Sequence, residues 1–138
     1  AHARELGYTG VSSKTCKGIY RSLLKAIRIR TGTVPGLFLS GEDLTCQAGL
    51  AVQQDLALVS LLGLSHVERN GHHYVAGMQG ASQAEKARFA AAHPDLYEQG
   101  ADGPLLSIRD GRITITSLEA VGYASGALPD FEAMTPLS

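Results

Sequence analysis

Residues 10–14, Gly-Val-Ser-Ser-Lys, introduce a pattern that recurs in the first half of the chain: a short apolar strand, a polar cluster, and then a helix or a loop. The second such strand covers residues 37–40 and precedes Gly41-Glu42-Asp43, and the third covers residues 64–68. In parallel α/β sheets, ligands bind beyond the carboxyl ends of the strands. The polar clusters at these ends are therefore the expected functional site.

Two helices separate these strands. Residues 17–30 carry apolar side chains at intervals of three and four, which mark a buried helical face: Ile19, Leu23, Leu24 and Ile27. Residues 47–62 form a second helix whose latter half is apolar almost all round, so we expect a sheet and a neighbouring element to bury it. The nearly constant spacing of the strands predicts a parallel sheet with right-handed helical crossovers.

The beginning of the chain resembles the middle of such a βα unit. Residues 1–6 are expected to end a helix, and Gly7 is expected to be its left-handed cap before the first strand. This arrangement is typical of the back portion of a larger enzyme.

The second half of the chain has a different character. Ser82-Gln83-Ala84-Glu85 is a capping box that opens an Ala-rich helix, and His93-Pro94 ends that helix. Residues 105–109 and 112–116 flank Asp110-Gly111, which predicts a β-hairpin. The remaining residues are rich in Gly, Pro and Ala, and we expect them to lie extended over another surface.

Composition excludes several classes of protein. The 138 residues, 44% of them hydrophobic, suit one domain with a core, and the formal charge of −1 gives no global field to hold nucleic acid or an anionic membrane. No apolar run approaches the roughly 20 residues of a membrane span. Cys16 and Cys46 form neither a Cys-x-x-Cys pair nor a disulfide framework. We therefore expect reduced thiols, a cytoplasmic protein, and no nucleic-acid or membrane partner.

Alternation along each strand places the candidate chemical groups in pairs that share a face: Ser12 with Lys14, Ser40 with Glu42, and His66 with Glu68. If these faces line a shared interior, a lysine, two carboxylates and an imidazole converge, and this mixture suits proton transfer. A partly desolvated lysine among other cations has a lowered pKa and then acts as a base. The pattern thus predicts a proton-transfer role for Lys14.

Each of these residues also has a purely structural interpretation. Lys14 is equally a surface lysine whose stem lies along the protein. Glu42-Asp43 is either a metal-binding or acid pair, or turn and N-cap chemistry before a helix. Glu68 ends a buried strand, where an unpaired carboxylate is costly, and Arg69 offers it a salt partner. The basic face of the first helix lacks interleaved aromatic residues and is expected to be solvated.

A metal site is a further interpretation of the third cluster. Its imidazole and carboxylate groups are possible ligands: His66, Glu68, His72 and His73. Their spacing matches no standard motif, and adjacent histidines rarely bind one ion. The sequence therefore assigns no metal ligand in this chain.

Val11-Ser12-Ser13-Lys14, with Thr15-Cys16-Lys17-Gly18 after it, resembles the sixth barrel strand of the enolase superfamily, in its mandelate racemase and muconate lactonizing branch. Residues 41–45, the helix through residues 54–57, and residues 66–74 resemble the seventh and eighth units of that family. The hairpin and tail are similar to its carboxyl-terminal extension.

This resemblance implies an α/β fold: a partial (β/α)8 TIM-type barrel of parallel strands, followed by a helix and a β-hairpin extension. Residues 1–80 would supply the sixth to eighth βα units. Residues 81–138 would supply the helix, the hairpin and an extended tail that packs on the barrel or on a capping domain. The expected protein partner is the rest of the barrel or a second copy of the chain.

The resemblance also implies a reaction, in which a proton is abstracted next to the carboxylate of a small substrate and Mg²⁺ holds the resulting enolate. Sugar-acid dehydratases, racemases and cycloisomerases share this first step. By position, Lys14 and Glu68 would be catalytic, and the expected substrate-binding residues are Ser12, Glu42, Asn70 and His72.

The metal ligands of that family lie on its third, fourth and fifth strands, which are not in this chain. We therefore expect the Mg²⁺ ligands to lie outside the chain, and the chain alone to be inactive. The alternative is a non-catalytic half-barrel that self-associates as a binding or scaffold module.

Overall fold

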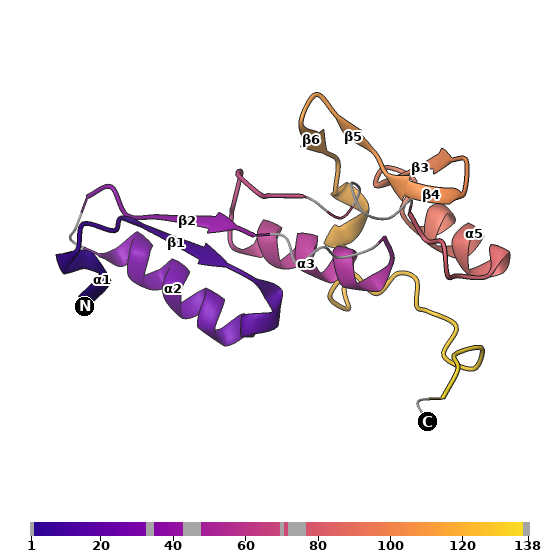
Figure 1. The fold of residues 1–138 in the computed structure, drawn as a ribbon, viewed down its shortest axis with the longest axis horizontal. Helices are drawn as coiled ribbons and strands as arrows, with labels where there is room; N and C mark the ends of the chain where they lie inside the picture. The colour runs from indigo at the N-terminus through magenta and orange to yellow at the C-terminus, as the bar shows by residue number, and fades with distance from the viewer. Residues whose placement is uncertain (1, 33–34, 43–47, 70, 72–76, 137–138) are drawn as a thin grey trace.

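The computed structural model describes residues 2–32, 35–42, 48–69, 71 and 77–136. In Figure 1 the elements form an elongated row, with β1, β2 and α2 at one end, α3 in the middle, and α5 with the antiparallel hairpins at the other end. The helices, including the 3-10 helices η1 and η2, and the strands are, in chain order, α1 (His2–Glu5), β1 (Gly10–Ser13), η1 (Thr15–Lys17), α2 (Ile19–Thr31), β2 (Phe38–Gly41), α3 (Leu50–Leu61), α5 (Gln83–Ala92), β3 (Tyr97–Gly100), β4 (Gly103–Leu106), β5 (Ile108–Arg109), β6 (Arg112–Ile113) and η2 (Thr116–Glu119).

Strands β1 and β2 are parallel, with Gly10 opposite Phe38 and Ser13 opposite Gly41. Helix α2 connects them, so the first βα unit has the predicted form. The residues that alternate along β1 therefore point in turn toward α2 and toward the helix-free face of the sheet.

The third predicted strand is present as one parallel bridge, between Gly41 and Val67. The Gly41 N–H donates to the His66 carbonyl at 3.1 Å, and the Glu68 N–H donates to the Gly41 carbonyl at 3.2 Å. The three predicted strand segments thus lie side by side in chain order, although only the first two are regular strands.

The predicted partial (β/α)8 barrel is wrong for the part of the chain that the structure describes. The strands form three separate two-stranded sheets, of which β1–β2 is parallel and β3–β4 and β5–β6 are antiparallel. A barrel closes only when many tilted strands share one continuous hydrogen-bonded sheet. Two parallel strands and one bridging residue are too few to curve round on themselves, and the result is a small α/β structure with short strand pairs.

Glycines with a left-handed backbone set the helix boundaries near the amino end. Gly7, with φ of 84°, follows α1 as predicted. Gly18, with φ of 87°, separates η1 from α2, so the first predicted helix begins at Ile19 rather than at Lys17. A Cβ atom disfavours a positive φ, which explains why glycine occupies both turns.

Helix α2 packs on the sheet through small residues. Ser22 and Ala26 are buried, and the Ser22 hydroxyl shares a 2.8 Å hydrogen bond with the hydroxyl of Ser13 in β1. Leu24 and Ile27 are each 54% exposed, so the predicted buried face is wrong for these two residues. The small side chains let the helix approach the sheet closely, and this contact turns the larger apolar residues outward.

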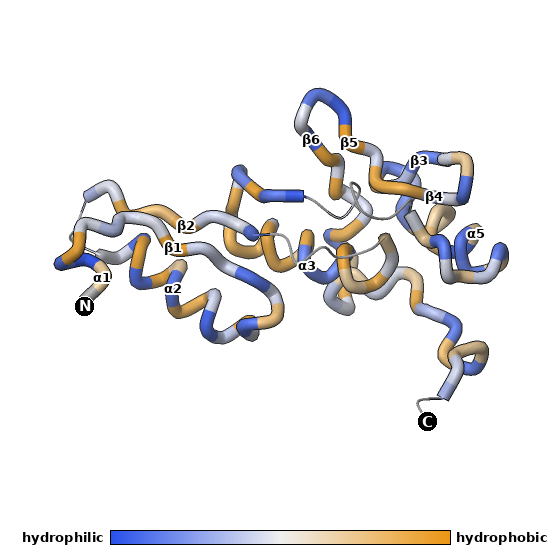
Figure 2. Tube along the Cα trace, viewed as in Figure 1, coloured by the Kyte–Doolittle hydropathy of each residue, from blue (hydrophilic) through white to orange (hydrophobic). Residues whose placement is uncertain are grey.

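Helix α3 is buried on more than one side, as predicted. Val52 and Leu56 belong to a larger core that includes Phe89, whereas Leu58 packs with Ala26 of α2 in a smaller core. In Figure 2 much of α3 is coloured as hydrophobic, with a hydrophilic stretch between the apolar segments. The larger core draws on residues before and after position 80, and the division of the chain at that position stays a prediction.

The N-cap role of Ser82 and the Asp110-Gly111 hairpin turn are confirmed. The Ser82 hydroxyl accepts the Glu85 N–H at 3.1 Å at the start of α5, which ends directly before His93. Asp110 and Gly111, with φ of 51° and 69°, form the tight turn between β5 and β6. The hairpin β3–β4 was not predicted.

His93 joins the end of α5 to the chain beyond β6. Its side chain is 1% exposed, its Nδ1 shares a 3.1 Å hydrogen bond with the Ser117 hydroxyl, and Gly126 lies against its ring. Asp95 accepts the Ser117 N–H at 3.0 Å. Burial lowers the pKa of His93, although the charge of Asp95 and the contact with Ser117 oppose the change.

We expect acid to weaken the folded state through His93. Because folding lowers the pKa of His93, the unfolded chain binds this proton first, and the free energy of unfolding falls as the pH drops below about 6.5. The free energy of unfolding changes by at most about 1.4 kcal/mol per pH unit for one proton. Urea unfolding between about pH 5 and pH 8 measures it, and His93→Gln should flatten the curve. An equally steep curve in the variant would contradict this assignment.

Candidate active site

The candidate site lies on the helix-free face of the sheet, at the carboxyl ends of β1 and β2. Ser12 and Lys14 point to this face because Ser13, between them, contacts Ser22 of α2. Glu42 directly follows β2, and its N–H donates to the Ser13 carbonyl at 3.0 Å. The parallel pairing therefore continues by one residue and carries Glu42 to the end of β1.

Ser12, Lys14 and Glu42 converge there, and we call these three residues the Lys14 cluster. The Ser12 hydroxyl donates to Glu42 Oε2 at 2.9 Å, and Lys14 Nζ forms an ion pair with Glu42 Oε1. Both carboxylate oxygens are thus held by the neighbouring strand. The side chains of Lys14 and Glu42 are 28% and 35% exposed, so small molecules have access to them.

The surroundings of Lys14 are anionic. The hydrogen bond to Glu42 raises the pKa of Lys14, burial opposes this effect, and the charge of Glu68 adds a smaller increase. The hydrogen bonds from Lys14 and Ser12 lower the pKa of Glu42. The prediction of a lowered lysine pKa is therefore wrong, because Lys14 sits among carboxylates rather than among cations. At neutral pH the pair is an ammonium beside a carboxylate.

Of the other predicted site residues, Glu68 and His66 lie next to β2, and four more lie outside the described part of the chain. Glu68 lies on the segment next to β2 and is close enough for its charge to act on Lys14. His66 is exposed, and its carbonyl accepts a bond from β2. Four further residues of the predicted clusters lie outside the described part of the chain: Asp43, Asn70, His72 and His73.

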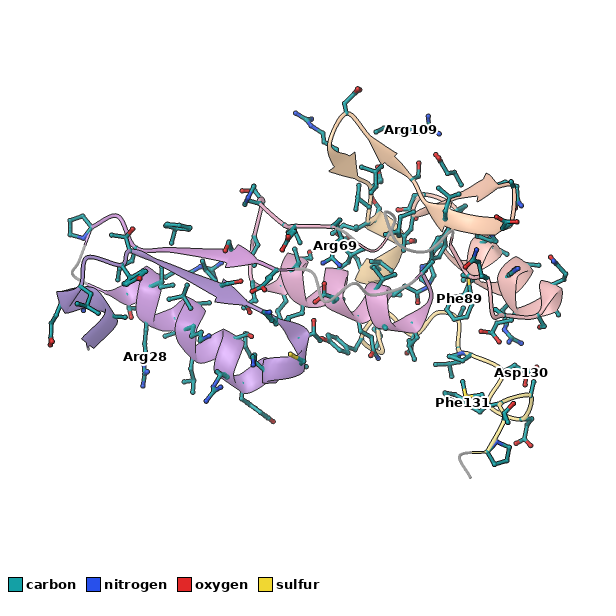
Figure 3. The ribbon with its side chains drawn as sticks, in the orientation of Figure 1. Arg28, Arg69, Phe89, Arg109, Asp130 and Phe131 are labelled. Atoms are coloured by element: carbon teal, nitrogen blue, oxygen red, sulfur yellow. The ribbon has the colours of Figure 1, made fainter. Side chains whose placement is uncertain are left out.

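A second polar network, centred on Asp55 of α3, was not predicted. The Asp55 carboxylate accepts a hydrogen bond from the Thr15 hydroxyl and forms an ion pair with the Arg69 guanidinium. Arg69 lies beside α3 in Figure 3, and the side chains of Arg69 and Asp55 are only 8% and 5% exposed. An acidic residue on a helix that is apolar almost all round was the available signal, because a buried carboxylate requires partners.

A large groove lies elsewhere. It has a volume of about 970 Å³ and is bounded by the start of α3, by α5 and by residues 129–135, which include Asp130 of Figure 3. Glu85 lines it, and its carboxylate accepts the Asp130 N–H at 3.0 Å. No member of the Lys14 cluster lines this groove. The hydrogen bond with the Asp130 N–H gives the Glu85 carboxylate a structural role there.

Within residues 2–32, 35–42, 48–69, 71 and 77–136, no group of three or more His, Cys, Asp and Glu side chains is arranged to hold a metal ion. The helices of that same part of the chain are all too short or too polar to cross a membrane.

Comparison of the chain with protein-family models, with curated proteins and with solved structures gives no match. The resemblance to the enolase superfamily thus stays a prediction.

We expect Glu42→Gln to lower the pKa of Lys14 toward its ordinary value, because the hydrogen bond to the ionised carboxylate is the largest cause of the raised pKa. The pair is formed between the lowered pKa of Glu42 and the raised pKa of Lys14. The pair stops stabilising the fold when the pH falls through the pKa of Glu42 or rises through the pKa of Lys14. The measurement is a pH titration of the Lys14 side chain by NMR. Glu68→Gln is the matched control and should give a smaller decrease; the reverse order would refute this account.

Proposed function

We propose that the Lys14 cluster is an acid/base site that transfers a proton at the carbon next to the carboxylate of a small substrate. The observation that supports this proposal is the convergence of Ser12, Lys14 and Glu42 on the open face at the carboxyl ends of two parallel strands. Such strand ends are where parallel α/β proteins place ligands and catalytic groups. The resemblance of the same residues to the enolase superfamily favours this reaction.

The charge state of the cluster defines what each residue does. Lys14 is an ammonium at neutral pH, so it is ready to bind the carboxylate of a substrate and to donate a proton to the α-carbon of an enolate. In the reverse direction the amine accepts the α-proton while the C–H electron pair moves into the carboxylate to form the enolate. Glu42 has a lowered pKa and is a poor proton acceptor, so its role is to hold Lys14 in place with the help of Ser12.

The resemblance implies Mg²⁺ for enolate stabilisation, and the described residues do not fit this ion. Mg²⁺ prefers several free carboxylate or carbonyl oxygens in octahedral geometry. Glu42, the best-placed carboxylate, is already engaged by Lys14 and Ser12, and the described residues form no cluster of three ligands. We therefore propose that any Mg²⁺ ligands lie outside the described residues, and we assign no step here to the ion.

Racemisation, dehydration and cycloisomerisation all begin with this proton transfer, and this shared first step is the reaction that we propose. A sugar acid is the substrate class that we propose. We also propose a cytoplasmic location, where the exposed Cys16 would remain a thiol.

The proposal predicts that the chain binds a sugar acid at the Lys14 cluster. Titration with D-gluconate, followed by NMR, should shift the signals of Ser12, Lys14 and Glu42, whereas uncharged glucose should not. Lys14→Met should weaken binding by about 10-fold to 100-fold, the usual cost of losing a hydrogen bond to a charged group.

Lys17→Met is the matched control, since Lys17 is an exposed lysine on η1 that does not belong to the cluster. It should leave gluconate binding close to that of the unmodified chain. Equal weakening by both lysine variants, or no binding of gluconate to the unmodified chain, would overturn the proposal.

A second candidate function is self-association without catalysis. Large apolar side chains lie exposed around the β1–β2–α2 unit and would be covered by a second copy of the chain: Tyr8, Tyr20, Leu24, Ile27 and Phe38. Three of them, Tyr20, Leu24 and Ile27, follow one another at helical intervals on α2 and so share one exposed face, and an apolar face of this kind marks a protein–protein contact.

We expect analytical ultracentrifugation to show a concentration-dependent dimer that Leu24→Ser combined with Ile27→Ser dissociates. Leu61→Ser changes an exposed leucine on α3 and should leave the dimer intact. A monomer at every concentration would exclude this function and leave the acid/base proposal in place.

A further inference from the structure

The buried Asp55 carboxylate contacts the residues that directly follow the two acid/base candidates. Thr15, whose hydroxyl donates to Asp55, follows Lys14, and Arg69, whose guanidinium pairs with Asp55, follows Glu68. Lys14 is the extended residue before η1, and its side chain pairs with Glu42, whereas the side chain of Thr15, the first residue of η1, contacts Asp55 of α3. Contacts made by Thr15 and Arg69 therefore set the positions of Lys14 and Glu68 without occupying the face to which these two point.

We infer that Asp55 is a positioning residue of the acid/base site, which sets how Lys14 and Glu68 lie relative to each other by anchoring the residue after each of them. The inference rests on the proposed function only in naming Lys14 and Glu68 as acid/base groups.

The backbone around Lys14 explains why the Thr15 contact matters. The Ser13 carbonyl accepts the Glu42 N–H at 3.0 Å, which fixes the chain before Lys14 on β2. The Lys14 carbonyl accepts the Lys17 N–H at 3.1 Å, so Lys14 belongs to the first turn of η1 and moves with it. The position of η1 is set against α3, and the Thr15–Asp55 hydrogen bond is the polar contact that joins them.

The same argument applies to Glu68 on the other side. Its N–H donates to the Gly41 carbonyl at 3.2 Å, one residue before Glu42. The Arg69–Asp55 ion pair then holds the following residue against α3. One carboxylate thus connects two chain segments that flank Glu42, and its burial makes this connection rigid, because an unpaired carboxylate in that place would be costly.

Gln53 provides a matched control on the same helix. It is also fully buried, and its Nε2 donates to the Tyr97 hydroxyl at 3.0 Å, which ties α3 to β3. A change at Gln53 therefore disturbs a buried polar contact of α3 that does not lead to the strand ends. It separates general loss of stability from loss of positioning.

The test uses the full chain and reads the Lys14 pKa by NMR titration together with unfolding in urea. Thr15→Val removes the hydroxyl without changing any charge, and it should lower the Lys14 pKa by at least half of the decrease that Glu42→Gln produces. Thr15→Ser keeps a hydroxyl and should restore the Lys14 pKa. Gln53→Leu should lower stability and leave the Lys14 pKa unchanged. Asp55→Asn should lower the Lys14 pKa at least as far as Thr15→Val.

An unchanged Lys14 pKa in Thr15→Val would overturn the inference, as would an equal decrease of the Lys14 pKa in Gln53→Leu. If Asp55→Asn does not fold, Thr15→Val and Thr15→Ser alone decide the question, because Thr15 lies near the surface. Gluconate binding to the unmodified chain is scored separately. Its absence rejects the proposed function, whereas its presence with an unchanged Lys14 pKa in Thr15→Val rejects the positioning role alone.

Discussion

The need to bury helix α3 on more than one side is the constraint on which the rest of the structure depends. Val52 and Leu56 contribute to the core that includes Phe89, and Leu58 contributes to the core shared with α2. The helix is therefore the one element common to both cores of the described residues. A helix without a polar face has no stable place at the surface, so the βα unit and the hairpin region must each supply a covering surface. Two buried polar side chains of α3 depart from this pattern: Asp55 is paired with Thr15 and Arg69 of the βα unit, and Gln53 donates to the Tyr97 hydroxyl of the hairpin region.

Local signals predicted the elements that short-range interactions determine. The Asp110-Gly111 turn and the Ser82 cap depend on neighbouring residues only, and both are present. The exposed faces of Leu24 and Ile27 were not predictable in this way, because they result from a close contact between α2 and a distant strand. The barrel failed for a related reason. A repeat of strands and helices indicates parallel pairing, but closure depends on a number of strands that the repeat does not specify.

The candidate site shows the same division. Alternation along β1 and β2 was enough to place Ser12, Lys14 and Glu42 on one face, because the period of a strand is fixed by its backbone. Their electrostatics were not predictable, since the sign of the pKa shift depends on which charges lie across the sheet. The Asp55 network joins residues 15, 55 and 69, and no local pattern connects positions so far apart. Its only trace in the sequence is that Asp55 is the single charged residue within residues 50–62.

The adjacent serines of β1 have a consequence for strand register. Ser12 points to the open face and Ser13 to α2, yet either residue would suit either position, so the pair itself does not resist a slip by one residue. Lys14 does, because such a slip would direct its long cationic side chain into the contact that Ser22 and Ala26 keep narrow. Gly41, which leaves room for Val67, would also be displaced by a shift of β2. The register of this short sheet is thus set by the steric clashes that a shifted strand would cause rather than by the side chains that pair across it.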